Sequence, residues 1–173
     1  MEKQYNLINI SHVSEEKGVK DYIKIASKLK KQFNVKCFWI GDGDLLSELK
    51  NSNVVIFVGK KTKNQKLKYF SLSNPILIST SYFEGFCIPI AEGALEFLPT
   101  VSYNIPEIIS VYGKYHNIVN YKNVNSLYNK IVKIIKNYDH YKKRSSKLRE
   151  FIISKYSIDS VNEKLQKILW KDD

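Results

Sequence analysis

The sequence predicts an α/β domain of the Rossmann-like type, a three-layer α/β/α arrangement around a parallel sheet of about six strands. Short apolar runs alternate along the chain with longer stretches whose apolar residues recur at helical spacing. Strands that alternate with helical patterns indicate βαβ units, whose right-handed crossovers build a parallel sheet. The last three periodic stretches have no strand between them, so we expect extra C-terminal helices.

The predicted strands are short and mostly apolar. Residues 35–40 have the composition expected of a parallel strand that is covered on both faces. The other runs repeat this pattern, and the last of them is expected at an edge of the sheet. The predicted strands cover residues 5–11, 35–40, 54–58, 75–79, 100–103 and 117–120.

The predicted helices follow the strands in turn. In the first of them, Val19, Tyr22, Ala26 and Leu29 are spaced to share one helix face. The helix after residue 87 is the central one, and the last helix is amphipathic. The predicted helices cover residues 17–33, a short stretch ending at 50, and residues 64–72, 88–97, 106–111, 126–136, 141–155 and 159–170.

Size and composition fit one globular domain. The chain has 173 residues, of which 43% are hydrophobic and 26% charged, so it can bury a real core. No apolar run approaches the ~20 residues that a membrane span needs, and residues 1–4 do not resemble a signal peptide. Two cysteines, Cys37 and Cys87, are too few for a disulfide framework and favour a cytoplasmic location. We therefore expect residues 1–173 to form a single domain.

The formal net charge of +11 raises the question of a polyanionic partner. Only Arg144 and Arg149 among the 28 basic residues are arginines, whereas readout of base edges prefers arginine. We therefore predict no nucleic-acid partner and attribute the lysines first to a compositional bias. A second interpretation is peripheral contact with an anionic membrane surface at its inner face.

Residues 79–92 contain the most informative pattern. An apolar run ends, Glu84 and Gly85 follow, and Pro89 falls where the first turn of a helix is expected. The free N–H groups and the dipole of a helix N-terminus suit an anion such as a phosphate. Glu84 and Glu92 lie on either side of this helix start and are better suited to accept hydrogen bonds from hydroxyls. Together these features describe a site for a nucleotide sugar.

Residues 84–94 (EGFCIPIAEGA) resemble the acidic signature E-G-F-G-x-P-x-x-E-A of family 4 of the retaining glycosyltransferases. Other segments resemble the family pattern in the same order, over most of residues 5–170. They are residues 10–18 (ISHVSEEKG, compare V-G-R-L-x-x-x-K-G), 39–46 (WIGDGDLL), 55–59 (VIFVG), 99–101 (PTV) and 105–109 (IPEII).

This resemblance implies that the chain is the C-terminal, donor-binding half of a GT-B fold, without the N-terminal acceptor domain. The implied reaction transfers a hexose, with a UDP-sugar as the first candidate donor and no required metal or cofactor. The implied acceptor is a saccharide or a lipid-linked molecule, in the synthesis of a bacterial cell-surface polysaccharide or glycolipid. The isolated domain is expected to transfer nothing, because half of the cleft would be absent.

The resemblance also assigns roles to the acidic segment. It implies that Glu92, expected in about the first turn of its helix, binds the ribose hydroxyls of the donor. Glu84 contacts the transferred sugar and, with Lys17, forms the catalytic pair. The backbone amides of residues 85–88, namely Gly85, Phe86, Cys87 and Ile88, face the diphosphate and sugar. Cys87 stands where the family usually has glycine, and its amide remains available if its φ stays negative.

Further residues are implied on the other side of the donor. Lys17 faces the diphosphate, and His12 replaces the usual arginine beside it. A neutral histidine brings no charge, whereas a protonated one would restore part of it. Gly41, Gly59 and Lys60 are expected to border the nucleotide pocket.

Other classes of protein find less support in the sequence. Residues 41–46 lack the third glycine of a dinucleotide fingerprint, and the three histidines show no metal-ligand spacing. Two alternatives stay open: a non-catalytic nucleotide-sugar-binding module that acts with a partner chain, and a basic module for RNA or a membrane surface. The final amphipathic helix, which includes Trp170, is expected to cross to a second domain or to drive self-association.

Overall fold

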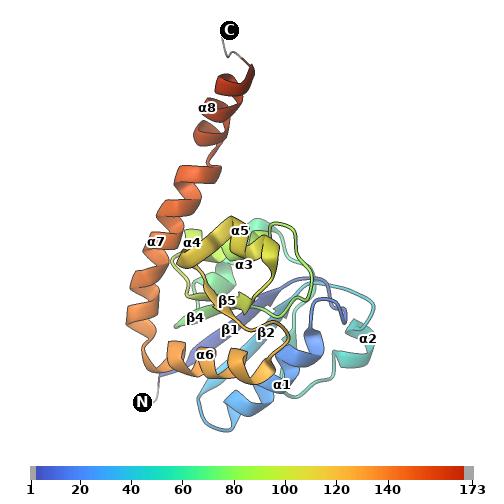
Figure 1. The fold of residues 1–173 in the computed structure, drawn as a ribbon. Coiled ribbons are helices and arrows are strands. Elements are labelled where there is room, and N and C mark those ends of the chain that lie inside the picture. Colours follow the sequence, from blue (N-terminus) through green and yellow to red (C-terminus); the bar gives the residue numbers. More distant parts are fainter. Residues whose placement is uncertain (1–2, 170–173) are drawn as a thin grey trace.

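Six parallel strands form the centre of the domain in the order β3-β2-β1-β4-β5-β6 (Figure 1). This computed structural model describes residues 3–169. The strands are β1 (Tyr5–Ile10), β2 (Val35–Ile40), β3 (Ile56–Phe57), β4 (Pro75–Ser79), β5 (Thr100–Tyr103) and β6 (Asn117–Val119). The predicted fold class is confirmed. The strand order reverses between β1 and β4, and in open α/β sheets this is where ligands bind, outside the carboxyl ends of the strands.

Helices cover both faces of the sheet. α1 and α6 pack on one face, while α3, α4 and α5 lie over the other, and α7 runs from the end of α6 to α4 (Figure 1). The helices are α1 (Val19–Lys30), α2 (Leu46–Leu49), α3 (Lys63–Phe70), α4 (Ile88–Leu95), α5 (Pro106–Tyr112), α6 (Val124–Lys136), α7 (Tyr138–Tyr156) and α8 (Ile158–Leu169), with a 3-10 turn η1 (Gly113–Tyr115).

Several boundaries differ from the sequence-based expectation, and local structure accounts for three of them. α1 begins at Val19 because Gly18, with φ +67°, is its N-cap. β3 is shorter than expected because the amides of Val54 and Val55 donate to the Ser52 hydroxyl instead of a strand ladder. α7 begins at Tyr138, since Asn137 alone separates it from α6.

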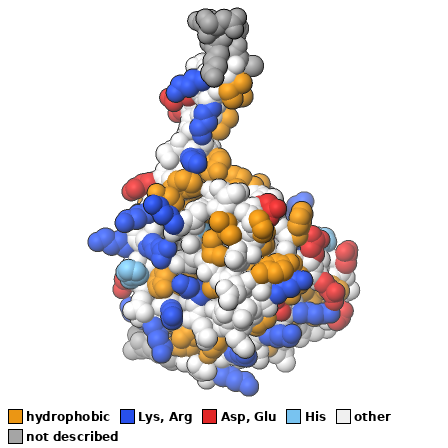
Figure 2. Space-filling model, in the orientation of Figure 1, with side chains coloured by type: hydrophobic (Ala, Val, Ile, Leu, Met, Phe, Trp, Pro, Cys, Tyr) orange, Lys and Arg blue, Asp and Glu red, His pale blue; other side chains and the backbone are white. Residues whose placement is uncertain are grey.

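α8 extends away from the body of the domain (Figure 1). Four of its apolar residues, Ile158, Val161, Leu165 and Ile168, are exposed, most of all Ile158 at 80% and Ile168 at 71%. In Figure 2, hydrophobic side chains lie along one side of this extended part of the chain. The expected amphipathic C-terminal helix is therefore present and uncovered along α8, whereas Trp170 lies outside the described residues.

The core contains one buried histidine. His116 is 3% exposed, and its two ring nitrogens lie 2.8 Å from Thr100 Oγ1 and 2.9 Å from Ser102 Oγ. Burial, and then the charge of Arg144, lowers the pKa of His116 to about 3. The folded protein therefore holds this ring in its neutral form.

We expect the free energy of unfolding to fall as the pH drops below 6.5, the ordinary pKa of histidine, toward the folded pKa of about 3. In this pH range the unfolded chain binds a proton at this histidine and the folded chain does not. This difference lowers the free energy of unfolding by about 1.4 kcal/mol per pH unit, or by about 2 kcal/mol between about pH 7 and pH 5. Urea unfolding at several pH values measures this loss. His116→Gln should be less stable throughout but should lack this component, and equal pH slopes for both proteins would contradict the assignment.

Candidate functional site

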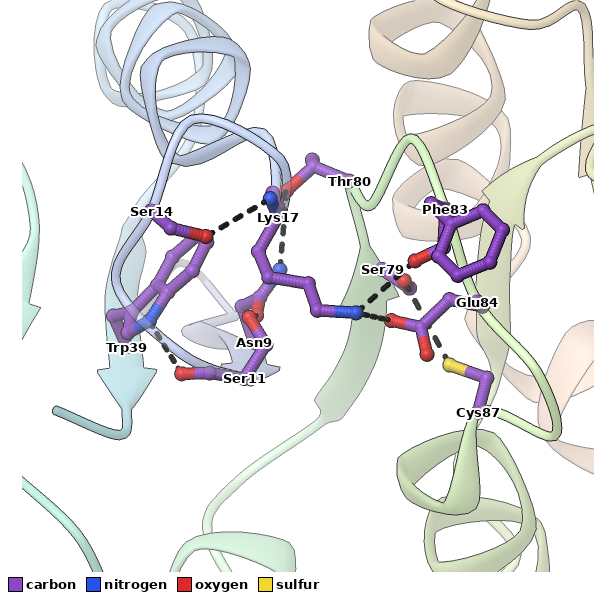
Figure 3. A network of polar contacts seen from close by, with 10 residues as sticks. All are labelled: Asn9, Ser11, Ser14, Lys17, Trp39, Ser79, Thr80, Phe83, Glu84 and Cys87. Carbon is purple, nitrogen blue, oxygen red and sulfur yellow. Dashed lines mark hydrogen bonds and ion pairs between the residues drawn. The ribbon is translucent and has the colours of Figure 1, made fainter. Parts of the chain in front are cut away.

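Two loops meet at the carboxyl ends of β1 and β4. The β1–α1 loop, residues 11–18, contacts the β4–α4 loop, residues 80–87 (Figure 3). The Thr80 hydroxyl donates to the Lys17 carbonyl at 2.9 Å, and the Tyr82 amide donates to the Glu16 carbonyl at 2.8 Å. At Gly18 a Cβ atom would lie 2.0 Å from the Thr80 carbonyl oxygen, so only glycine allows this approach. The strand order thus brings the two predicted functional segments together.

Lys17 and Glu84, the predicted catalytic pair, are in direct contact across the two loops (Figure 3). The Lys17 Nζ lies 3.0 Å from Glu84 Oε1 and donates a second hydrogen bond of 3.0 Å to the Phe83 carbonyl. The side chains are 23% and 14% exposed, respectively. The positive charge that opens α1 is therefore balanced by a carboxylate from the neighbouring loop.

The start of α4 has free backbone donors. In the described part of the chain, the N–H groups of Gly85, Phe86, Cys87 and Ile88 donate to no other group. Gly85 and Ile88 are exposed, so packed side chains do not cover this helix end. Pro89 lies in the first turn of α4, as predicted. These amides and the helix dipole form a site for an anion.

Cys87 has a left-handed backbone conformation, which glycine adopts more readily than other residues. We expected its amide to be available on the condition that its φ is negative. The observed φ is +53°, so this condition is not met. The side chain nevertheless leaves the approach open, because it is 5% exposed and its Sγ lies 3.8 Å from Ser79 Oγ in the interior. The Tyr112 hydroxyl holds the Cys87 carbonyl at 3.1 Å. Burial, followed by the Glu84 charge, raises the pKa of the thiol to about 12, so it stays neutral.

Glu92 is the fifth residue of α4, directly after the first turn of the helix, which begins at Ile88 as predicted. Its Oε1 accepts a hydrogen bond from Lys66 Nζ of α3. Its Oε2 is buried and has no hydrogen-bond donor in the described chain. An unsatisfied carboxylate oxygen is uncommon and costly, so this atom needs a donor.

A hollow of about 450 Å³ lies beside this site at the carboxyl ends of β1 and β2. It brings together the predicted residues His12, Gly41 and Lys60, and adds Lys61 and Lys66. Its positive charge suits an anionic ligand. The hollow is lined by Ile10, Ser11, His12, Ile40, Gly41, Asp42, Lys60, Lys61 and Lys66.

Gly41 and Gly59 shape the backbone of this hollow. The Gly41 amide donates to the Gly59 carbonyl at 3.1 Å, which joins the ends of β2 and β3. A Cβ at Gly41 would lie 1.9 Å from the Ser11 carbonyl oxygen. His12 lies at the rim with Nε2 3.8 Å from the Asp44 carboxylate.

Sequence reasoning missed two residues of this region. Lys66 holds Glu92, but nothing in the sequence distinguishes it from the other lysines. Asp21 is 6% exposed and accepts 2.8 Å hydrogen bonds from the hydroxyls of Tyr82 and Tyr103. Burial, and then this hydrogen bond, raises the pKa of Tyr82 to about 12. An acidic residue among the apolar positions of the first helix was the available signal. Asp21 fixes the loop that carries Glu84.

No group of three or more His, Cys, Asp or Glu side chains in residues 3–169 is arranged to hold a metal ion. Among the helices of the same residues, none is both long and apolar enough to cross a membrane.

The family described as Glycosyl transferases group 1 matches residues 1–151 of this chain. A poly(ribitol-phosphate) alpha-N-acetylglucosaminyltransferase of Staphylococcus aureus is 29% identical over 168 residues, which are 90% of this chain and 33% of that protein. The chain therefore spans about a third of the length of this curated relative.

Solved structures share the fold. TarM of S. aureus, in complex with Fondaparinux, alpha-GlcNAc-glycerol and UDP, is 25% identical with a TM-score of 0.79, over 98% of this chain and 36% of that one. HepE of Anabaena, in complex with UDP and glucose, is 17% identical with a TM-score of 0.80, over 96% of this chain and 48% of that one.

We expect Gly18→Ala to lower the free energy of unfolding by about 3 kcal/mol or more, because the new methyl group meets the Thr80 carbonyl and φ is left-handed. Gly113→Ala is the matched control. Gly113 also has a positive φ, +51°, but nothing lies within 4 Å of its Cβ position, so its cost should be about 1–2 kcal/mol. Urea unfolding compares the two, and equal losses would show that the loop contact contributes nothing.

Proposed function

The chain belongs to the glycosyl transferases group 1, and we propose that it binds the nucleoside diphosphate sugar donor at the carboxyl ends of β1 and β4. The observation that carries this proposal is the row of free amides from Gly85 to Ile88 at the start of α4, with Lys17 beside it. Fixed backbone donors and a cation at a helix N-terminus suit a diphosphate.

In this proposal each acidic side chain binds hydroxyls of the donor. Glu92, whose buried Oε2 has no donor within residues 3–169, accepts a hydrogen bond from the ribose after a small rotation of its side chain. Glu84 accepts from the transferred sugar. Lys17 has three N–H donors, so it can turn one toward the diphosphate while it keeps its contact with Glu84. The nucleotide extends into the hollow bordered by His12, Gly41, Gly59 and Lys60.

We propose retaining transfer of the sugar to an acceptor hydroxyl. As the bond to the sugar breaks, negative charge grows on the diphosphate, where the amides of α4 and Lys17 are already in place to stabilise it. UDP is the first candidate nucleotide, because structures of TarM and HepE contain it. A saccharide or lipid-linked acceptor of the cell surface is our proposal for the second substrate, in line with the poly(ribitol-phosphate) of the relative's name.

A second domain would supply the acceptor side of the cleft. The exposed apolar residues of α8, including Ile158, Val161, Leu165 and Ile168, suit contact with such a domain or with a partner chain. The proposal therefore has this domain bind donor alone and transfer sugar only together with the acceptor-binding half.

We expect calorimetry with UDP, GDP, ADP and their sugar forms to show the strongest binding for the uridine compounds. Glu92→Ala should weaken UDP binding about tenfold or more, since a hydrogen bond to a charged group is lost. Glu107→Ala, an exposed acidic residue in the first turn of α5, is the control and should bind as wild type. No binding of any nucleotide at millimolar concentration would exclude the proposed donor site.

Lys17→Met should lower affinity for UDP about tenfold or more, with a smaller effect on UMP, because the lysine faces the diphosphate rather than the base. Lys20→Met removes the same charge one helical turn away, from an exposed pair with Glu15, and should leave both affinities unchanged. The ratio of UDP to UMP affinity, measured for the three proteins, is the readout. An unchanged ratio in Lys17→Met would refute the assignment of Lys17 to the diphosphate.

A further inference from the structure

A second basic concavity lies between η1 and α7, and we call it the basic trough. Its main cavity has a volume of about 610 Å³. A neighbouring cavity of about 580 Å³ shares Lys114, Tyr115 and Lys147 with it and continues to Phe151. The main cavity is lined by Lys114, Tyr115, His140, Lys143, Arg144 and Lys147.

The basic trough lies at the opposite edge of the sheet from the donor site. η1 directly precedes β6, so it lies at the amino ends of the strands. The beginning of α7 is fixed at the same edge, because the Tyr138 hydroxyl donates to the carbonyl of Pro75, the first residue of β4. Ser145 likewise donates to the carbonyl of Leu98, just before β5. A ligand in the basic trough therefore cannot touch a donor bound at the carboxyl ends.

Carboxylates balance little of the charge of the basic trough, since Glu150 of the neighbouring cavity is the one acidic residue among the described residues that line the two cavities. Among residues 3–169, no ion pair includes Lys114, Lys143, Arg144 or Lys147, and no acidic residue lines the main cavity. Lys and Arg side chains gather along the lower part of α7 in Figure 2. Like charges held this close repel one another, so a bound anion would relieve this repulsion.

The walls of the basic trough are held in position and are partly aromatic. Arg144 Nη2 donates to the Lys114 carbonyl at 3.1 Å, which ties α7 to η1. The ring of Tyr115 stacks on that of Phe151, with centroids 4.9 Å apart and an interplanar angle of 28°. The Lys114 Nζ lies 5.7 Å from the centroid of the Tyr115 ring. A cationic group next to an aromatic surface suits an anion that carries an organic part.

We propose that the basic trough is a second anion site, which binds a phosphate monoester carried on a small polyol or sugar. The cations on α7 and η1 bind the phosphate, and the rings of Tyr115 and Phe151 contact the carbon skeleton. The concave shape favours such a compact ligand over a flat membrane surface. The site goes beyond donor binding and does not depend on it.

The test is calorimetric titration of the 173-residue chain with glycerol 3-phosphate and, separately, with UDP. We expect binding of glycerol 3-phosphate that weakens as salt is raised and that UDP does not compete away. Lys143→Glu combined with Lys147→Glu, both exposed on α7, should weaken it about tenfold or more and leave UDP binding unchanged. The control combines Lys24→Glu with Lys31→Glu, two exposed lysines of the α1 region, which change the net charge equally and should have little effect.

Three results would overturn the proposal. The first is no binding of glycerol 3-phosphate up to about 10 mM by a chain whose thermal unfolding is cooperative. The second is an equal loss in the control variant, which would indicate general charge attraction. The third is binding to vesicles of phosphatidylglycerol and phosphatidylcholine without binding of glycerol 3-phosphate, which would indicate a membrane contact. Because UDP is titrated independently, failure here is distinguishable from failure of the donor site.

Discussion

The close approach of the β1–α1 loop to the end of β4 is the constraint on which the site depends. Parallel strands bring their carboxyl ends to one edge of the sheet. This proximity alone would leave the Lys17 and Glu84 side chains exposed to solvent. The missing side chain at Gly18 lets the backbone of one loop lie against the Thr80 carbonyl of the other. This contact produces the partly buried ion pair, because the backbone of the two loops holds Lys17 and Glu84 next to each other.

Both acidic residues assigned to the site are paired with lysine, and the two pairs join different elements of the fold. Lys17 and Glu84 join two loops, whereas Lys66 and Glu92 join α3 to α4. Each pair holds a carboxylate in a fixed position near the start of α4, where a ligand of high negative charge is proposed. The lysines reduce the repulsion that such a ligand would otherwise meet from Glu84 and Glu92.

The fold, the helix start at Ile88 with Pro89 in its first turn, and the segments that meet at the site could all be predicted from the sequence. These follow from local periodicity, turn chemistry and the rule that parallel strands end at one edge. The role of Lys66 could not be predicted, because a lysine that pairs with a carboxylate on another helix cannot be distinguished in the sequence from a lysine exposed to solvent. The length of β3 was overestimated because the Ser52 hydroxyl accepts hydrogen bonds from amides that the strand ladder would otherwise use. The pattern of apolar residues does not reveal this competition.

The left-handed residue before α4 has a consequence for how relatives of this domain are found. Cysteine occupies the conformation usually left to glycine, and its short side chain turns inward toward Ser79 while its carbonyl accepts a hydrogen bond from the Tyr112 hydroxyl. This position requires a left-handed φ and a small side chain that points inward, and more than one amino acid meets both requirements. A profile that insists on glycine there would overlook distant members whose backbone follows the same path.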